Sequence, residues 1–379
     1  MFNACSSEAT KELVVRPDET DPTWELVLQE DSISREVQVE AIDDNNYIVA
    51  FTYSLAGINS KKKQNWRTYI KAGDYTTDIA FLTPTPDGHF VAGGSAQDVE
   101  NGDMFGWLVK VDTAGKIRWQ QSYKHLPSFN DIVITPKGEI AVTGVVSGTF
   151  YLSKMKPDGE LIWQQFYEGV SYNGKGISNT KEGGFIVTNS SDIDTTDLGF
   201  HIRTIKTDAD GNEVWSKVFK VDQSALPQAV FLDTAGNYMV IGVSEDTIMH
   251  QSTFALKLDS EGKQLSVKSQ YWNDDVPDHI SDVQQTKEGT YVFIGQFINF
   301  RVPYRMMIGK LDMDGNAIWT RSIPKTDGRR GGSSVAILPN GTILGLGYVS
   351  DLEEAINPGE GASLLTIPGN GGVARKTDY

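Results

Sequence analysis

The residues of this chain best suited to binding chemistry are aromatic, arginine and histidine residues in or near its longest inter-strand segments. Aromatic rings stack on the apolar faces of sugars, and arginine and aspartate side chains pair with hydroxyl groups. The same side chains serve peptide recognition. The alternative is that these aromatic residues only pack one loop against another. The candidate ligand-binding residues are Trp272, Tyr271, His279, Arg301, Tyr304, Arg305, Arg329, Trp107 and Tyr172.

The sequence contains weaker evidence for catalytic residues than for ligand-binding residues. Asp274 and Asp275 are adjacent in sequence, but adjacency does not set the separation that a glycosidase needs between its two carboxylates. The segments 208–212 and 312–316 resemble the start of a calcium loop but lack its later glutamate, and a hairpin turn explains them. No nucleophile elbow, phosphate loop or zinc-protease motif occurs. The sequence therefore predicts no catalytic residue, no metal site and no cofactor.

Charge limits the partners that this chain can bind. The 379 residues carry a net charge of −16, which disfavours non-specific binding to nucleic acid or to an anionic membrane surface. Plain solubility is the alternative reason for the charge. No apolar run reaches the roughly 18 residues that a membrane-spanning helix needs. We expect a monomer that binds a glycan or a protein or peptide ligand, and no nucleic acid.

The single cysteine, Cys5, follows Ala4 and precedes a polar stretch that extends to about residue 21. This context resembles the processing site of a bacterial lipoprotein, in which a lipid is attached to the cysteine. Four residues cannot form a signal peptide, so this interpretation requires coding sequence upstream of Met1. It predicts a tether over residues 1–21 and an outer-membrane lipoprotein of the bacterial cell envelope that meets the membrane only through its lipid anchor. The alternative is a chance cysteine in a disordered leader.

A repeated motif determines how the candidate residues are positioned. In its best copy, Lys154 stands five residues before Gly159, and Trp163 stands four residues after that glycine. The motif recurs roughly every 50 residues, which indicates an internal repeat of one supersecondary unit. One copy has Ser266 where the others have tryptophan. The other copies begin at Lys110, Lys206, Lys257 and Lys310.

Each unit reads as four short strands rich in β-branched and aromatic residues and bounded by turn residues. The first hairpin of a unit has a turn glycine and a second glycine six residues later, as in Gly138 and Gly144. The first glycine permits a positive φ in a tight turn, and the second permits close backbone approach. Seven such hairpins occur, at residues 36–53, 78–95, 129–146, 174–190, 225–243, 280–297 and 332–348.

Seven four-stranded units can bury both of their faces only against one another, so a closed ring is the expected arrangement. The prediction is an all-β, seven-bladed β-propeller of four-stranded antiparallel blades that forms one domain over residues 22–379. Either the strand at 24–29 or the one at 371–375 completes the last blade, and we favour 24–29, which would close the ring with N- and C-terminal strands. Tryptophans are expected to wedge between adjacent blades at Trp66, Trp119, Trp163, Trp215 and Trp319.

The Lys-x-Asp-x-x-Gly-Asn-x-x-Trp motif, as in Lys206 to Trp215, resembles the β-propeller repeats of bacterial secreted proteins and lipoproteins. It is also similar to the pyrroloquinoline-quinone-type repeat of quinoprotein dehydrogenases and of the propeller lipoprotein in the outer-membrane barrel-assembly machine. The resemblance implies blades. It does not extend to quinone ligands, and a shared fold does not carry a function with it.

In such a blade the short Asp-Gly turns lie on one face of the ring and the long loops lie on the other. Loops on a rigid scaffold are where binding usually occurs. The leading hypothesis is therefore a non-enzymatic, lipid-anchored propeller that binds a glycan or polypeptide on its long-loop face. One alternative is an assembly scaffold for outer-membrane proteins. Another is a polysaccharide hydrolase or lyase.

Overall fold

The computed structural model contains strands, turns and bends and, in the part of the chain described below, no helix. No helix within that part could therefore span a membrane. The residues that the structure describes are 25–29, 37–61, 63–70, 75–98, 100–126, 128–171, 175–191, 199–247, 250–270, 278–297, 305–323, 329–350, 361–367 and 369.

Twenty-eight strands form seven four-stranded antiparallel sheets, here called blades one to seven. The strands of blades one to three are β2 (Gln38–Ala41), β3 (Asn46–Phe51), β4 (Ser54–Asn59), β5 (Gln64–Tyr69); β6 (Tyr75–Pro84), β7 (Phe90–Asp98), β8 (Met104–Val111), β9 (Ile117–Tyr123); β10 (Asp131–Ile134), β11 (Ile140–Val146), β12 (Thr149–Met155) and β13 (Leu161–Val170). Those of blades four to seven are β14 (Ile177–Asn179), β15 (Phe185–Ser191), β16 (His201–Thr207), β17 (Glu213–Phe219); β18 (Ser224–Leu232), β19 (Tyr238–Glu245), β20 (Gln251–Leu258), β21 (Gln264–Gln270); β22 (Asp278–Gln285), β23 (Tyr291–Phe297), β24 (Arg305–Leu311), β25 (Ala317–Ile323); β26 (Arg329–Ile337), β27 (Ile343–Ser350), β28 (Gly361–Ile367) and β1 (Glu25–Gln29).

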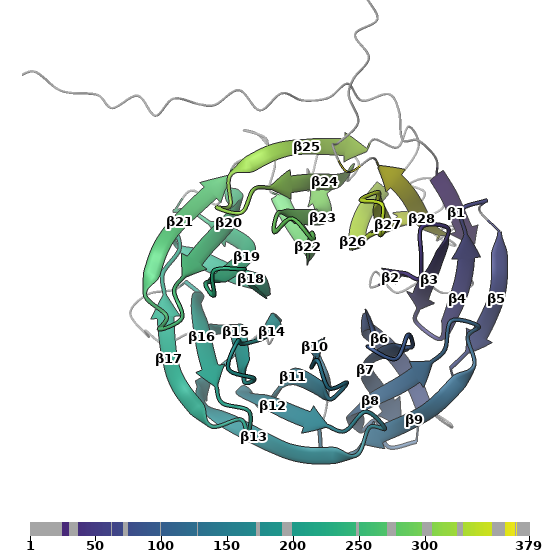
Figure 1. Cartoon of the computed structure of the whole chain (residues 1–379), viewed down its shortest axis with the longest axis horizontal. Helices are drawn as coiled ribbons and strands as arrows, with labels where there is room; N and C mark the ends of the chain where they lie inside the picture. Colours follow the sequence, from purple (N-terminus) through teal and green to yellow (C-terminus); the bar gives the residue numbers. More distant parts are fainter. Residues whose placement is uncertain are drawn as a thin grey trace, which may run out of the picture.

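The blades are arranged in a ring, with the first strand of each blade nearest the axis (Figure 1). Adjacent first strands contact one another around the whole ring, including β26 of blade seven and β2 of blade one. Separate clusters of buried aliphatic and aromatic side chains fill the spaces between neighbouring blades. The predicted all-β, seven-bladed propeller is confirmed.

Blade seven combines strands from distant parts of the chain. β1 pairs antiparallel with β28, so that Glu25 lies opposite Leu365 and Gln29 lies opposite Gly361. The order of this sheet is β1-β28-β27-β26, which makes β1 its outermost strand. Trp24 and the rival segment 371–375 lie outside the described residues.

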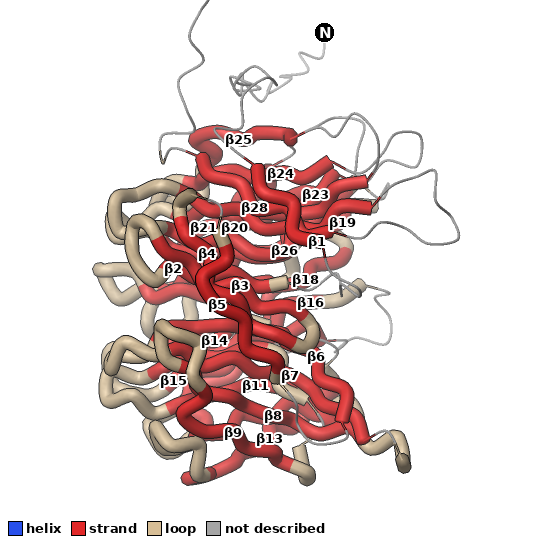
Figure 2. The backbone as a smooth tube through the Cα atoms, turned by 90° about the vertical axis from the view of Figure 1, so that its right-hand side faces the viewer, coloured by secondary structure: helices blue, strands red, loops and turns tan. Residues whose placement is uncertain are grey.

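The two faces of the ring differ in their connections. Because the strands of a blade are antiparallel and consecutive, the turns between strands one and two and between strands three and four lie on the same face. These turns are tight and are drawn in tan on one side of Figure 2. Gly138 and Gly159 occupy two of them with φ angles of 79° and 87°. We call this side the turn face and the opposite side the long-loop face.

The second glycine of the first hairpin is required by close backbone approach, as predicted. A Cβ on Gly144 would collide with the carbonyl oxygen of Ser128, and one on Gly295 would collide with that of His279. In blade six the innermost strand shifts register between Ile280 and Asp282, next to this glycine. The bulge brings the backbone of the innermost strand against the second strand.

In blades one to four the tryptophan of the motif contacts the turn of the following blade. The ring of Trp119 lies against Gly159 and that of Trp163 lies against Gly211. The Trp119 indole Nε1 also donates a hydrogen bond to the carbonyl oxygen of Pro157, at 3.1 Å. The predicted tryptophan wedge between blades is therefore present, and the indole ring packs against the turn glycine of the next blade.

The lysine of the motif, for which the sequence suggested no role, makes an ion pair on the turn face. Lys110 Nζ lies 2.8 Å from Asp87 Oδ2, and Lys154 Nζ lies 2.8 Å from Glu139 Oε2. In both pairs the carboxylate belongs to the first hairpin turn of the same blade. The lysine side chain thus ties the two turns of a blade together.

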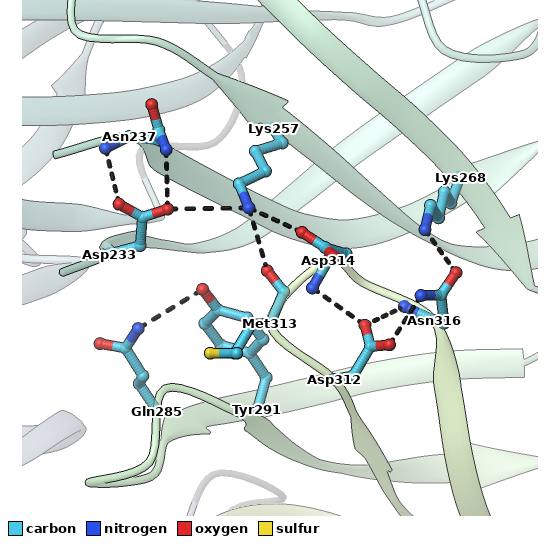
Figure 3. A network of polar contacts seen from close by, with 10 residues as sticks. All are labelled: Asp233, Asn237, Lys257, Lys268, Gln285, Tyr291, Asp312, Met313, Asp314 and Asn316. Atoms are coloured by element: carbon cyan, nitrogen blue, oxygen red, sulfur yellow. Dashed lines mark hydrogen bonds and ion pairs between the residues drawn. The ribbon is translucent and has the colours of Figure 1, made fainter. Parts of the chain in front are cut away.

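Blade five lacks the tryptophan and uses polar contacts instead (Figure 3). Lys257 Nζ donates to Asp314 Oδ1 of blade six at 2.8 Å and to the Met313 carbonyl oxygen at 3.4 Å. Lys268 Nζ donates to Asn316 Oδ1. The hydrogen bond from Lys257 and its positive charge lower the pKa of Asp314. Charged groups therefore connect blade five to the same turn of the next blade that an indole ring contacts elsewhere.

Candidate functional site

Three of the predicted ligand-binding residues have described side chains. His279 lies in β22, Arg305 begins β24, and Trp107 lies in β8. For Arg329 the structure describes the backbone, at the start of β26. The other predicted residues, Trp272, Tyr271, Arg301, Tyr304, Tyr172 and Cys5, lie outside the described residues.

The expectation of an accessible Trp107 is wrong. Its side chain is fully buried, and its indole Nε1 donates to the Ser95 carbonyl oxygen at 2.8 Å. Trp107 lies directly opposite Gly94 in the neighbouring strand. A large side chain is accommodated at this position because the cross-strand partner has none. Trp107 is a core residue of the third strand and is not available to a ligand.

The long-loop ends of blades six and seven bring several of the remaining residues together. His279 lies opposite Gln296 in the neighbouring strand, and Arg305 lies opposite Phe297. The Tyr348 hydroxyl of blade seven donates to Gln296 Oε1 at 2.7 Å. All four residues lie at the long-loop ends of their strands. His279, Gln296 and Tyr348 lie on the side where blade six faces blade seven, whereas the alternation of side chains along β24 places Arg305 on the other side of blade six. We call His279, Gln296, Arg305 and Tyr348 the blade six–seven cluster.

All four side chains of the blade six–seven cluster are half-buried. Burial and the positive charge of Lys175, on the segment that leads into blade four, lower the pKa of His279. The imidazole is therefore neutral at pH 7, with one nitrogen that donates and one that accepts hydrogen bonds. Together with the Gln296 amide and the Tyr348 phenol, it gives this side of blade six neutral donors and acceptors, and the Arg305 guanidinium adds a positive charge on the other side of the blade.

A second group of titratable side chains surrounds the axis next to this cluster. Glu40, Asp131 and Asp282 lie on the innermost strands β2, β10 and β22, which surround the axis in Figure 1. Lys175 precedes the innermost strand of blade four. These four side chains are half-buried. We call Glu40, Asp131, Lys175 and Asp282 the axial group.

Two of the axial carboxylates connect one blade to the next. Asp131 Oδ2 accepts a hydrogen bond from the Gly176 backbone N–H of blade four at 2.9 Å. Asp282 Oδ2 accepts from the Ser334 hydroxyl at 3.0 Å and from the Val335 N–H at 2.9 Å, both in blade seven. These contacts hold the innermost strands in register around the axis.

Desolvation raises the pKa values of the axial carboxylates. Burial, and then the negative charge of Asp282, raise the pKa of Glu40 to about 8. Burial raises the pKa of Asp131 to about 6, against hydrogen bonds from two backbone N–H groups. Burial also raises the pKa of Asp282. The axial group therefore retains protons at a pH where surface carboxylates have lost theirs.

The arrangement is suited to binding through hydrogen bonds. Within the described ranges, no three His, Cys, Asp or Glu side chains are close enough together to hold a metal ion. The blade six–seven cluster instead presents hydrogen-bonding groups of both kinds on a rigid set of strand ends, which is the usual make-up of a specificity site.

Sequence reasoning found His279 and Arg305 but missed Gln296, Tyr348 and the whole axial group. A signal for the axial carboxylates existed, because Asp131 and Asp282 each stand immediately before apolar residues in an innermost strand. A buried charge at such a position is costly and needs a partner or a role. No sequence signal indicated that Gln296 and Tyr348, on different blades, would meet.

Comparison with known proteins identifies the fold. No protein-family model matches the chain, and none of the curated proteins matches it. Among solved structures, streptogramin B lyase is similar with a TM-score of 0.57 and 11% identity, over 90% of this chain and 97% of that chain. A Dyadobacter fermentans DSM 18053 protein of unknown function is similar with a TM-score of 0.51 and 9% identity, over 91% and 98% of the two chains. At these identities the likeness extends to the fold alone.

Proposed function

We propose that this protein is a non-enzymatic binding protein of the bacterial cell envelope, which holds a glycan or a polypeptide on its long-loop face at blades six and seven. The observation that carries the proposal is the blade six–seven cluster, in which Tyr348 and Gln296 of two blades meet beside His279. The turn face is a poorer candidate, because its lysines and tryptophans already contact protein groups.

The residues that precede the cluster in sequence support this choice of ligand. Trp272 and Tyr271 come shortly before His279, and Arg301 and Tyr304 come shortly before Arg305. In the proposal these aromatic residues stack on sugar rings or on apolar side chains, and the blade six–seven cluster pairs with hydroxyl or peptide groups.

A double substitution tests the site. The His279→Ala, Arg305→Ala variant is expected to lose about tenfold to a hundredfold in affinity, because each lost contact contributes about 1 kcal/mol. The measurement is binding of the purified protein to an array of envelope polysaccharides and peptides, followed by titration of the strongest ligand. A matched control, His89→Ala with Arg118→Ala, removes the same residue types far from the cluster and should bind normally.

The outcomes of this experiment also separate the competing functions. Equal affinity of wild type and the cluster variant would contradict the proposed site. Cleavage of an arrayed polysaccharide would replace the binding function with a hydrolase or lyase. Binding only to outer-membrane proteins, with no glycan or peptide ligand, would favour the assembly scaffold.

Lipid attachment at Cys5 is the part of the proposal that concerns localisation. It rests on Ala4 preceding the cysteine and on the polar stretch that follows it. Cells that express the complete coding sequence should incorporate an alkyne-bearing fatty acid into the protein, and the labelled form should be in the outer-membrane fraction. Cys5→Ser should abolish the label. Labelling that persists in Cys5→Ser would contradict a lipid at this residue.

A further inference from the structure

The outer strand of blade three, β13, is an exposed sheet edge. The order of its sheet is β10-β11-β12-β13, and no other described strand pairs with the outer side of β13. It runs along the rim of the ring in Figure 1. One row of its backbone N–H and C=O groups therefore has no strand partner, and such a row can pair with another extended chain.

β13 lacks features that five of the six other outer strands have, and the sixth, β1, also contains no lysine or arginine but has only five residues. β13 has ten residues, whereas β5, β9, β17, β21 and β25 have six or seven. Each of those five strands contains a lysine or an arginine, and β13 contains neither. A short edge and a positively charged side chain are the usual means by which proteins prevent edge-to-edge pairing. The central part of β13, from Trp163 to Tyr167, pairs with β12 without a register shift.

The exposed side of β13 is apolar. Ile162, Phe166 and Val170 are 43%, 53% and 48% exposed, respectively. Trp163 and Tyr167 point the other way and contact Gly211 of blade four, as the alternation of side chains along a strand requires. The Phe166 ring packs against the ring of Tyr151 in the neighbouring strand β12, with ring centroids 6.0 Å apart.

Two acidic residues accompany these apolar side chains, one before Ile162 and one between Phe166 and Val170. Glu160 immediately precedes the strand, and Glu168 is an exposed residue near its end. Glu160 is paired with Lys156 at 2.7 Å. With a net charge of −16 on the whole chain, the rim repels another acidic surface and favours basic groups.

We propose that β13 binds an extended polypeptide segment of a partner as a fifth strand of blade three, with apolar residues at alternate positions and basic residues at its ends. The backbone groups of β13 without a strand partner, apart from the Glu168 and Val170 carbonyl oxygens, which accept from Arg203 and Ser191, supply the hydrogen bonds. The exposed Ile162 and Phe166 side chains supply the apolar contact. The exposed Glu168 carboxylate favours a basic residue at one end of the segment, whereas Glu160 is already paired with Lys156. This surface lies on the rim and is separate from the blade six–seven cluster, so the inference does not depend on the proposed function.

A second copy of this chain is the less favoured occupant of the edge. Two copies would bring together two chains of charge −16 and would place Glu168 near its counterpart on an antiparallel strand. A strand pair of this length buries well below the roughly 1,200 Å² of a stable interface. A basic peptide avoids the charge repulsion, and as a weak, transient ligand it does not need the interface area of a stable dimer.

The test uses a fluorescein-labelled peptide of seven alternating valine and threonine residues with two lysines at each end. Its fluorescence anisotropy should rise with the concentration of the wild-type protein. The same peptide with N-methylated central residues lacks the central backbone N–H donors and should bind at least tenfold more weakly. Equal binding of the two peptides, or no binding of the first at millimolar protein, would overturn the proposal.

Matched protein variants locate the binding edge. Ile162→Lys with Phe166→Lys adds the missing positive charges to exposed positions of β13 and should weaken binding at least tenfold, with an unchanged melting temperature. Val214→Lys with Val218→Lys makes the same change on β17, which already contains Lys217, and should bind as wild type does. Unaltered affinity of the β13 variant, or equal losses in both variants, would also overturn the proposal.

Discussion

Replacing Trp163 with alanine is expected to lower the free energy of unfolding by about 3 kcal/mol, the low end of the range for a large aromatic side chain, because the indole ring is half-buried. The indole ring lies against Gly211 of blade four and meets the Phe185 ring edge-on, with centroids 6.1 Å apart. It belongs to the cluster of apolar side chains that joins blades three and four. Its removal leaves a gap between two blades that backbone movement can fill only partly.

Denaturant unfolding of wild type and Trp163→Ala measures this loss directly. Ser266→Trp is the matched comparison, since it inserts an indole at the same repeat position in blade five. It should change stability by less than about 1 kcal/mol, because Lys257 and Lys268 already connect blade five to blade six. Ala255 also occupies the space beside Gly315 that an indole ring fills in other blades. Superimposable unfolding curves for wild type and Trp163→Ala would show that the indole ring between blades three and four does not stabilise the protein.

The architecture was predictable because the repeat specifies local structure and the way in which neighbouring units pack. A glycine such as Gly159 forms a turn that receives Trp119 of the preceding blade, and Trp163 four residues later contacts the turn of the following blade. Seven first hairpins then leave little choice of architecture, since each sheet must bury both faces. The role of Lys154 was not predictable in the same way. Its partner Glu139 belongs to a different hairpin turn, and nothing in the spacing shows that the two turns lie side by side.

The candidate site was less predictable because its members come from different blades. His279 and Arg305 could be proposed from their residue types, but the Tyr348–Gln296 contact depends on how blades six and seven pack. Trp107 shows the opposite error. An aromatic residue near a polar segment suggested a binding site, and the cross-strand position of Gly94 instead gives the ring a place in the core.

Glu40→Gln is expected to stabilise the protein at alkaline pH and to have little effect near pH 5. Burial and the charge of Asp282 raise the pKa of Glu40 from 4.5 to about 8 in the folded protein. The folded state therefore binds a proton that the unfolded chain releases at lower pH, so wild-type stability falls as the pH rises from 4.5 to about 8. Asp131, with a pKa raised to about 6, contributes in the same direction. Glutamine cannot ionise, so the variant does not lose the stability that the wild type loses when Glu40 ionises at alkaline pH.

The expected size of this stabilisation follows from the pKa shift and from solvent access. Each pKa unit corresponds to about 1.4 kcal/mol, but Glu40 is only half-buried and water near the axis screens its charge. We therefore expect a gain of about 2 kcal/mol above pH 8. Urea unfolding at about pH 5 and about pH 8.5 measures it, with Glu261→Gln as an exposed control that should shift neither curve. A Glu40→Gln variant with the same stability as wild type at both pH values would mean that the Glu40 carboxylate is ionised at no cost. In that case ionisation of the axial carboxylates would not change the free energy of unfolding.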